Sequence, residues 1–220
     1  GKGLKSLSVE GDVISSDDTV VKESFEFTGG ASSIELEKYD AVCVVGCFAG
    51  QRAVQAIVKD YATSTMKLAD TIPVSRRLFE AMLASLVEKS LAYDVVRKIS
   101  LASAKPLYYM ENPLYSIDIL SHPHGSLLKA VLDAGAMAEI QASYLLARER
   151  TIGKMAKIIL QPPSTVKERF FTESAFSQGS SRLSPRAPLH KADDFNHMNG
   201  QYGVLALDAF FTAFAESTQR

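Results

Sequence analysis

The sequence predicts an α/β fold in which a mostly parallel sheet is covered by helices on both faces. Three short apolar runs, at residues 40–46, 105–110 and 157–160, have the length and composition of buried strands. Apolar residues recur at helical spacing in the stretches 75–102 and 127–147 and in a final stretch that begins near residue 200. Because strands that alternate with long helices form crossover units, the strands are expected to run parallel.

The first 39 residues lack this alternation. Turn-forming groups such as Gly11-Asp12 and Gly29-Gly30 separate short apolar pieces at 20–21 and 25–27. We therefore predict that residues 1–39 form an irregular excursion of extended pieces, within a single domain at 1–220. Since the chain opens on Gly1 and not on Met, we expect this domain to be N-terminally incomplete.

Each predicted strand ends at residues that favour a turn. The run 40–46 is continuously apolar and ends at Gly46, which predicts a central strand that is buried on both faces. The second strand runs into Asn112 and a proline, and the third into Gln161 and two prolines. Because proline cannot donate a hydrogen bond to a sheet, these two strands are expected to end there.

Three helices are predicted. The first is one long helix over 75–102, with Ser75 as its N-cap, and the second covers 127–147. The third begins near Gly200. Its apolar face consists of Val204, Leu207, Phe210, Phe211 and Phe214.

Composition excludes several classes of protein. With 24 Lys and Arg, 25 Asp and Glu and no basic block, the chain is not expected to bind nucleic acid. No apolar run approaches the roughly 18 residues that a membrane span needs, so no membrane association is expected. Cys43 and Cys47 lie too far apart on one strand to pair, at about 3.3 Å per residue. Two reduced thiols favour a cytoplasmic protein, and a small molecule is the expected partner.

The order of elements predicts where a ligand binds. In parallel sheets the ligand lies at the carboxyl ends of the strands. Gly46, Asn112 and Gln161 each follow a strand, and the loop with Asp194 and His197 precedes the last helix. We expect all four segments to meet in one crevice.

The loop before the last helix carries the strongest chemical signal. Asp194 lies three residues before His197, and a carboxylate in that position holds an imidazole in one tautomer, as a general base requires. The competing interpretation is structural: Asp194 or Asn199 accepts hydrogen bonds from backbone N–H groups as a turn or helix cap.

A metal site is a further interpretation of the same loop. His190, Asp193, Asp194 and His197 are all possible ligands within eight residues. No Cys joins them, and the His-x-x-x-His spacing of a helical zinc site does not occur. The sequence therefore predicts no metal and no cofactor.

Two other groups have ordinary structural interpretations. The glycines of residues 46–50 lack the Lys-Ser/Thr of a phosphate loop, so nucleotide binding is not expected. Cys47 could be a nucleophile, but a buried, inert thiol is the commoner arrangement. His122 and His124 fit a turn that leads into the following helix.

The strand that ends at Gly46, the strand that runs into Asn112, and the Asp194-Phe-Asn-His197 block together resemble the SGNH (GDSL-like) hydrolase family. The likeness covers most of the chain and extends, through Gly203, to a bacterial subgroup found in part among polysaccharide genes. It implies a flavodoxin-like three-layer α/β/α fold and a Ser-His-Asp triad. Asp194 would be its orienting acid and His197 its general base.

The chain departs from the family pattern at two positions. The nucleophile block Gly-Asp-Ser is absent, because Gly11-Asp12 is followed by Val13 in a polar turn region. We expect the nucleophile serine, and the first strand with it, to lie upstream of Gly1. The family's Gly-x-Asn oxyanion block would fall on Gly46, with Phe48 in place of Asn. Asn112 is then the candidate side-chain donor beside the Gly46 N–H.

The resemblance implies a serine ester hydrolase or acyl transferase that acts on a small acyl ester, such as an O-acetyl group on a carbohydrate. The 220 residues alone are predicted to be inactive, because they lack the serine. The alternative is a non-catalytic SGNH-like domain that binds a saccharide or a protein partner. The sequence predicts no particular oligomeric state.

Overall fold

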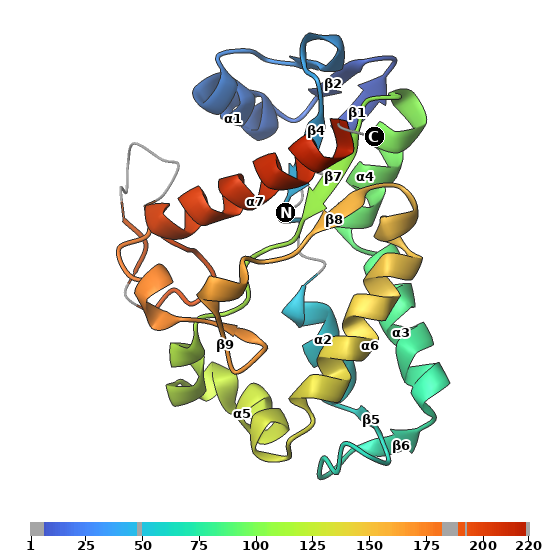
Figure 1. Ribbon diagram of the computed structural model, residues 1–220, viewed down its shortest axis with the longest axis vertical. Helices are drawn as coiled ribbons and strands as arrows, with labels where there is room; N and C mark the ends of the chain where they lie inside the picture. Colours follow the sequence, from blue (N-terminus) through green and yellow to red (C-terminus); the bar gives the residue numbers. More distant parts are fainter. Residues whose placement is uncertain (1–6, 48–49, 182–188, 192, 219–220) are drawn as a thin grey trace.

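The computed structural model of the chain (Figure 1) describes residues 7–47, 50–181, 189–191 and 193–218. Its centre is a parallel sheet with the strand order β4-β7-β8, made of β4 (Val42–Val45), β7 (Leu107–Met110) and β8 (Lys157–Ile159). Val42 pairs with Leu107, and Tyr109 pairs with Ile158. The three predicted strands and their parallel direction are confirmed.

The middle strand is β7, and β4 lies at the edge of the sheet in the part of the chain that the structure describes. All four residues of β7 are buried. In β4 only Val44 is buried, and Val45 is 61% exposed. The prediction that the run 40–46 is a central strand buried on both faces is therefore wrong. A continuous apolar run reports burial of some kind, but the position in the sheet depends on pairing with distant residues.

Helices cover β7 on both faces, as predicted. Tyr108 and Met110 join a small apolar cluster with α7 (Gly200–Thr218), and the Tyr108 ring lies 5.4 Å from that of Phe210. Leu107 and Tyr109, which alternate with them, belong to the larger core. Figure 1 shows α7 crossing one face of the sheet while α4 lies behind the other.

The predicted helix over 75–102 is two helices, so the prediction of one long helix is wrong. Ser75 is confirmed as the N-cap of α3 (Arg76–Glu88), since its hydroxyl accepts from the Leu78 N–H at 3.2 Å. Ser90 caps α4 (Leu91–Ala102) in the same way. The second cap competes with continuation of the first helix and ends it.

The stretch 127–147 is also divided, into α5 (Ser126–Asp133) and α6 (Met137–Arg150). Gly135 lies between them with φ +68°, a conformation that glycine adopts readily and that ends a helix. The terminal helix predicted from near Gly200 is confirmed as α7.

The N-terminal region contains a three-stranded antiparallel sheet of β1 (Leu7–Glu10), β2 (Val13–Ser16) and β3 (Ile34–Glu35). The prediction of extended pieces holds for these strands. It is wrong for the apolar pieces at 20–27, because they belong to α1 (Thr19–Gly29).

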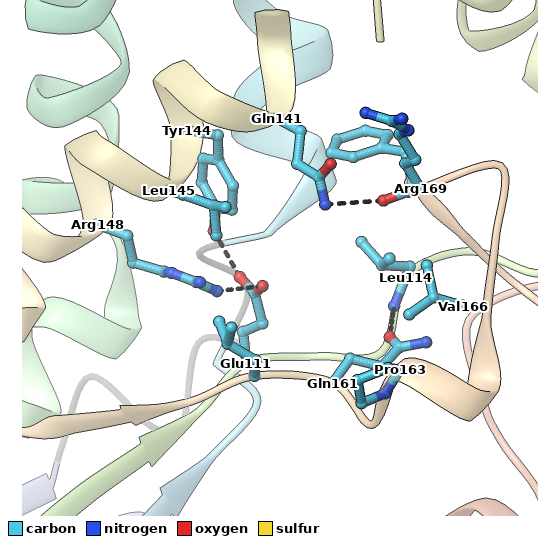
Figure 2. Close-up of a pocket in the computed structure, with 12 residues that line it drawn as sticks. Glu111, Leu114, Gln141, Tyr144, Leu145, Arg148, Gln161, Pro163, Val166 and Arg169 are labelled. Carbon is cyan, nitrogen blue, oxygen red and sulfur yellow. Dashed lines mark hydrogen bonds and ion pairs between the residues drawn. The ribbon is translucent and has the colours of Figure 1, made fainter. Parts of the chain in front are cut away.

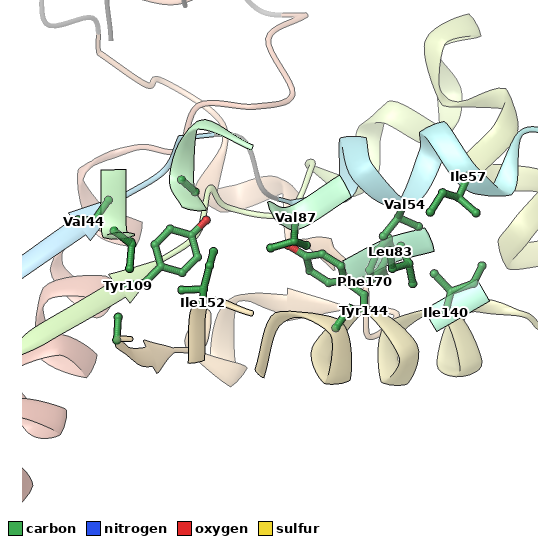
Figure 3. Packing of buried hydrophobic residues seen from close by; sticks show 14 of the residues in the cluster. Val44, Val54, Ile57, Leu83, Val87, Tyr109, Ile140, Tyr144, Ile152 and Phe170 are labelled. Atoms are coloured by element: carbon green, nitrogen blue, oxygen red, sulfur yellow. The ribbon is translucent and has the colours of Figure 1, made fainter. Parts of the chain in front are cut away.

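The larger core extends from the N-terminal region, where it includes Leu7 and Ile14, past the parallel sheet to the helices beyond its carboxyl edge (Figure 3). Residues from α3 and α6 interleave there with residues of α2 (Gln51–Val58) and with Phe170. The remaining strands are β5 (Tyr61–Thr63), β6 (Ile72–Val74), β9 (Val166–Lys167) and β10 (Phe171–Thr172). Among the described residues, the helices are all too short or too polar to cross a bilayer.

Candidate functional site

The loop before α7 is folded around the Asp194 carboxylate. Its Oδ1 accepts hydrogen bonds from the backbone N–H groups of Asn196 at 3.0 Å and of His197 at 3.2 Å. This is the turn that an Asp side chain stabilises by closing onto the backbone that follows it. The structural interpretation of Asp194 is therefore confirmed.

The same carboxylate also holds the His197 ring. Nδ1 of His197 lies 2.9 Å from both Oδ1 and Oδ2 of Asp194. The His197 side chain is 57% exposed, and its Nε2 has no hydrogen-bond partner in the described part of the chain. A ring that is fixed through Nδ1 and open at Nε2 has the arrangement of a general base.

The charge of Asp194 fits this arrangement. Burial raises the pKa of Asp194. The hydrogen bonds from the His197 ring and from the two backbone N–H groups lower it by more than burial raises it, so the net pKa lies below its ordinary value. The carboxylate is ionised at neutral pH and can only accept hydrogen bonds. Nδ1 of His197 therefore carries the proton, which leaves the lone pair on Nε2.

His190 packs against this pair. Its ring stacks on that of His197, with centroids 3.9 Å apart and planes inclined by 14°. Its Nδ1 lies 2.9 Å from Oδ2 of Asp194. The orientation is not that of a hydrogen bond, so this buried ring nitrogen has no hydrogen-bond partner among the residues described. Asp193, the fourth ligand considered above, is exposed.

Backbone hydrogen bonds fix the loop to the rest of the protein. The Ser116 N–H donates to the Phe195 carbonyl at 2.9 Å, and the Asn199 N–H donates to the Phe176 carbonyl at 2.7 Å. Oδ1 of Asn199 accepts from the backbone N–H groups of Gln201 and Tyr202 at 3.1 and 3.2 Å. Asn199 is therefore confirmed as a cap of α7, and it connects the loop to the helix.

Gly46 and Asn112 lie together at the carboxyl edge of the sheet. Gly46 has φ +84°, and a Cβ atom at this position would lie only 2.9 Å from Oδ1 of Asn112. Glycine thus allows the close approach of the amide. The Gly46 N–H, however, donates to the Met110 carbonyl at 2.8 Å. It is engaged in the sheet, so the structure does not support its expected role as an oxyanion donor.

Asn112 and the loop before α7 border the same small hollow, of about 20 Å³. Asn112 and Asn196 both line it, and Asn196 directly precedes His197. Two of the segments that the sequence placed in one crevice therefore meet. Phe48, the residue expected in place of the oxyanion Asn, lies outside the described residues.

Gln161, from the third segment, has a structural task. Its Oε1 accepts from the Leu114 N–H at 2.9 Å, and its Nε2 donates to the hydroxyls of Thr165 and Thr172 at 3.0 Å. The side chain joins the end of β8 to the chain that leaves β7. Both N–H groups of the Gln161 amide donate within the protein, so neither is left to bind a ligand.

Sequence reasoning missed a second polar cluster, in which α6 meets the end of β7. Tyr144 donates to one oxygen of Glu111 at 2.7 Å, and Arg148 pairs with the other oxygen. Figure 2 shows both side chains of α6 directed at Glu111 beside a cavity of about 500 Å³. The sequence contained two signals: Glu111 directly follows a strand, and Tyr144 and Arg148 lie four residues apart on one helix face.

The cysteines fit the inert interpretation. Both are free and partly buried. Burial raises the pKa of Cys43 to about 11 and also raises that of Cys47. The thiolate form is therefore disfavoured, and Cys47 is a poor nucleophile at neutral pH.

His122 and His124 form the expected turn before α5. Nδ1 of His122 accepts a hydrogen bond from the His124 N–H at 3.3 Å.

A polar hollow of about 320 Å³ opens beside the histidine stack. His190 and Lys191 from the loop line it together with Asp118, Ser177 and Gln178. Its size is that of a small-ligand site.

No family model, curated protein or solved structure matches the chain.

Proposed function

We propose that the protein is an SGNH-like serine ester hydrolase or acyl transferase, with the corresponding flavodoxin-like arrangement, and that it acts on a small acyl ester. The observation that carries this proposal is the bond between Asp194 and His197, at 2.9 Å, on a ring that is open to solvent at Nε2. A fixed imidazole next to an ionised carboxylate is the acid-base half of a Ser-His-Asp triad.

In this proposal a serine hydroxyl attacks the carbonyl carbon of the ester while Nε2 of His197 takes its proton. The imidazolium that forms is stabilised by Asp194 and returns the proton to the leaving alcohol. A second alcohol or water then takes up the acyl group by the reverse sequence. Asn112 is the donor that we assign to the developing oxyanion, because the Gly46 N–H is engaged in the sheet.

The serine itself is proposed to come from residues ahead of Gly1. Among the described residues, His197 has no hydrogen bond to a hydroxyl group. The outer edge of β4 has no neighbouring strand in the same part of the chain. A further parallel strand paired there would end at the carboxyl edge of the sheet, where its following turn lies close to Gly46.

The polar hollow beside His190 is where we propose that the alcohol part of the substrate binds. Charged and amide side chains, among them Asp118, Gln178 and Lys191, line it. Such groups match the hydroxyls of a carbohydrate better than a long apolar chain. An O-acetylated saccharide is the substrate class that we infer.

Hydrolysis of p-nitrophenyl acetate tests this proposal. The protein is expressed with the sequence encoded ahead of Gly1, and His197→Ala is compared with His124→Ala, which changes a histidine of an exposed turn. Loss of the base is expected to lower kcat by about 10³-fold or more, whereas the control retains activity. The 220-residue chain alone is expected to be inactive. Equal turnover in the wild type and in His197→Ala would refute the assigned role.

The second candidate function is non-catalytic binding of a saccharide or a protein partner. It is favoured by the same observation that His197 contacts no hydroxyl in the described part of the chain. The sequence encoded ahead of Gly1 distinguishes the two functions. A strand followed by Gly-Asp-Ser supports the enzyme, and a turn without serine supports the binding domain.

A further inference from the structure

We propose that His190, Asp194 and His197 bind one divalent metal ion of the zinc type, and that this ion and the Asp194–His197 acid-base pair exclude each other. One possible ligand atom from each of the three side chains lies within 4.8 Å of the others. No other group of three or more such residues occurs in the described part of the chain. The inference goes beyond the proposed hydrolase, because it concerns binding by the loop itself.

The distances between the ligand atoms match a shared ion. Nδ1 of His190 and Nδ1 of His197 each lie 2.9 Å from Oδ2 of Asp194. Two atoms bound to one zinc ion at about 2.0–2.1 Å stand about 2.9–3.3 Å apart, depending on the angle between the bonds. The distance from each histidine nitrogen to Asp194 is therefore already close to that of two atoms bound to one ion.

The buried nitrogen of His190 supplies an independent observation. Its Nδ1 is inaccessible to solvent and close to a carboxylate oxygen, but it makes no hydrogen bond to any described residue. A buried polar atom without a partner destabilises the fold. A metal ion between this nitrogen and Asp194 would satisfy it, because the lone pair of a neutral imidazole is a zinc ligand.

Binding requires the histidine stack to open. Near-parallel rings direct their lone pairs side by side, and ligands of one ion must converge. His190 is the fixed partner, with a side chain only 12% exposed and a backbone N–H that donates to the Ser180 carbonyl at 3.0 Å. The more exposed His197 ring is therefore the one that turns, and it gives up its bond to Asp194 when it does so. Three protein ligands then leave a fourth position for water or a ligand, as in zinc sites that are not closed.

The same geometry makes the ion an inhibitor of the proposed base. Nδ1 of His197 cannot both bind a metal ion and donate a proton to Asp194. With Nδ1 on the metal, the neutral ring carries its proton on Nε2 and has no lone pair there to accept one. Zinc at this site thus removes the general base without displacing the loop.

Zinc binding to the tag-free chain, measured without substrate by competition with a chromophoric chelator, tests the inference. One equivalent of zinc is expected to bind. Co²⁺ bound in place of zinc is expected to give the visible absorption of a four-coordinate site. His190→Ala and, separately, His190→Gln should weaken binding about tenfold or more, because each removes one ligand. His124→Ala is the matched control, and its affinity should equal that of the wild type.

Circular dichroism checks that each variant is folded. If one of the two His190 variants misfolds, the other is used for the comparison. Binding of one equivalent with unchanged affinity in the folded His190 variants would overturn the inference, as would the absence of stoichiometric binding to the wild type. Because the readout is binding and not turnover, either result stands whether or not the protein hydrolyses esters. In an active preparation, zinc inhibition that disappears with a chelator supports the exclusion.

Discussion

Two carboxylates, Glu111 and Asp194, organise the side chains around them differently. The cluster of Glu111, Tyr144 and Arg148 is closed, because its cation is fully buried, whereas the cluster of Asp194, His190 and His197 is open, because the His197 ring is exposed. Around Glu111, the Arg148 side chain is fully buried and the Tyr144 hydroxyl donates to the carboxylate. Around Asp194, the His197 ring is fixed on one edge and exposed on the other. The same type of acid therefore serves two different ends, depending on what its partners can reach.

The pKa directions express this difference. Burial and Glu111 raise the pKa of Tyr144 well above its ordinary value. Burial lowers the pKa of Arg148, but Glu111, Tyr144 and Tyr109 together raise it, so that the net pKa is raised. Both groups keep their protons at any pH near neutrality. The open cluster instead exposes one edge of the His197 imidazole to solvent. The closed cluster is therefore suited to stabilising the fold, and the open one is where we propose the chemistry.

Asp194→Asn separates the two clusters most strongly. In the protein that carries the nucleophile, this change keeps the shape of the side chain but removes the charge that orients and stabilises the His197 ring. We expect kcat to fall by about 10⁴-fold, as measured for ester hydrolysis. Asp193→Asn is the matched control, since this neighbour is exposed. Equal losses in both variants would mean that the loop has no specific acid.

The second prediction concerns stability and the closed cluster. Arg148→Met leaves the Glu111 carboxylate without its buried cation, and we expect the free energy of unfolding in urea to fall by about 3–5 kcal/mol. Arg150→Met is the control on the same helix, because Arg150 is exposed and lies 3.3 Å from Glu80. That surface pair should contribute about 1 kcal/mol or less. Similar losses in the two variants would contradict the distinction between closed and open clusters.

A smaller effect is expected where the open cluster joins the helix. Asn199→Ala removes the oxygen that caps α7 and the amide that donates to the Ala175 and Gln178 carbonyls at 2.8 and 3.0 Å. Loss of such a cap costs about 0.5–2 kcal/mol. Urea unfolding measures the loss, and Asn199→Asp, which retains the capping oxygen, should recover part of it. A variant without the amide and the cap that is as stable as the wild type would contradict this role.

The smallest expected effect is a change of stability with pH, caused by the Asp194 carboxylate. Because the folded pKa of Asp194 lies below its ordinary value, its ionised form stabilises the fold above that ordinary value, and the stabilisation is lost as the pH falls through the folded pKa. The stability difference between the wild type and Asp194→Asn should therefore be largest near neutral pH and shrink in acid. Unfolding midpoints at several pH values test this, and a difference that is constant with pH would contradict it.

The sequence predicted the elements of the fold better than their arrangement. Short apolar runs located β4, β7 and β8, because local burial patterns suffice for that. They did not show that β4 is an edge strand, since strand order depends on pairing between residues about sixty positions apart. The helix breaks at Ser90 and Gly135 were missed because each depends on a single residue within a continuous apolar pattern.

For the site, the sequence predicted the local pair and missed the distant one. Asp194 and His197 are three residues apart, so a turn brings them together almost by itself. Glu111 and Arg148 are 37 positions apart, and only the tertiary fold, which places α6 beside the end of β7, joins them. The role expected for the Gly46 N–H failed for a related reason, because its partner belongs to another strand.

The tautomer of His197 tests the central claim most directly. In the metal-free chain, nitrogen-15 chemical shifts of the ring, recorded above the pH at which the imidazole loses its charge, distinguish Nδ1–H from Nε2–H. A ring held by the Asp194 carboxylate is predicted to be protonated on Nδ1 and bare on Nε2, and Asp194→Ala should abolish that preference. A wild-type ring protonated on Nε2 would contradict the account, because it would have no lone pair for a proton from the nucleophile.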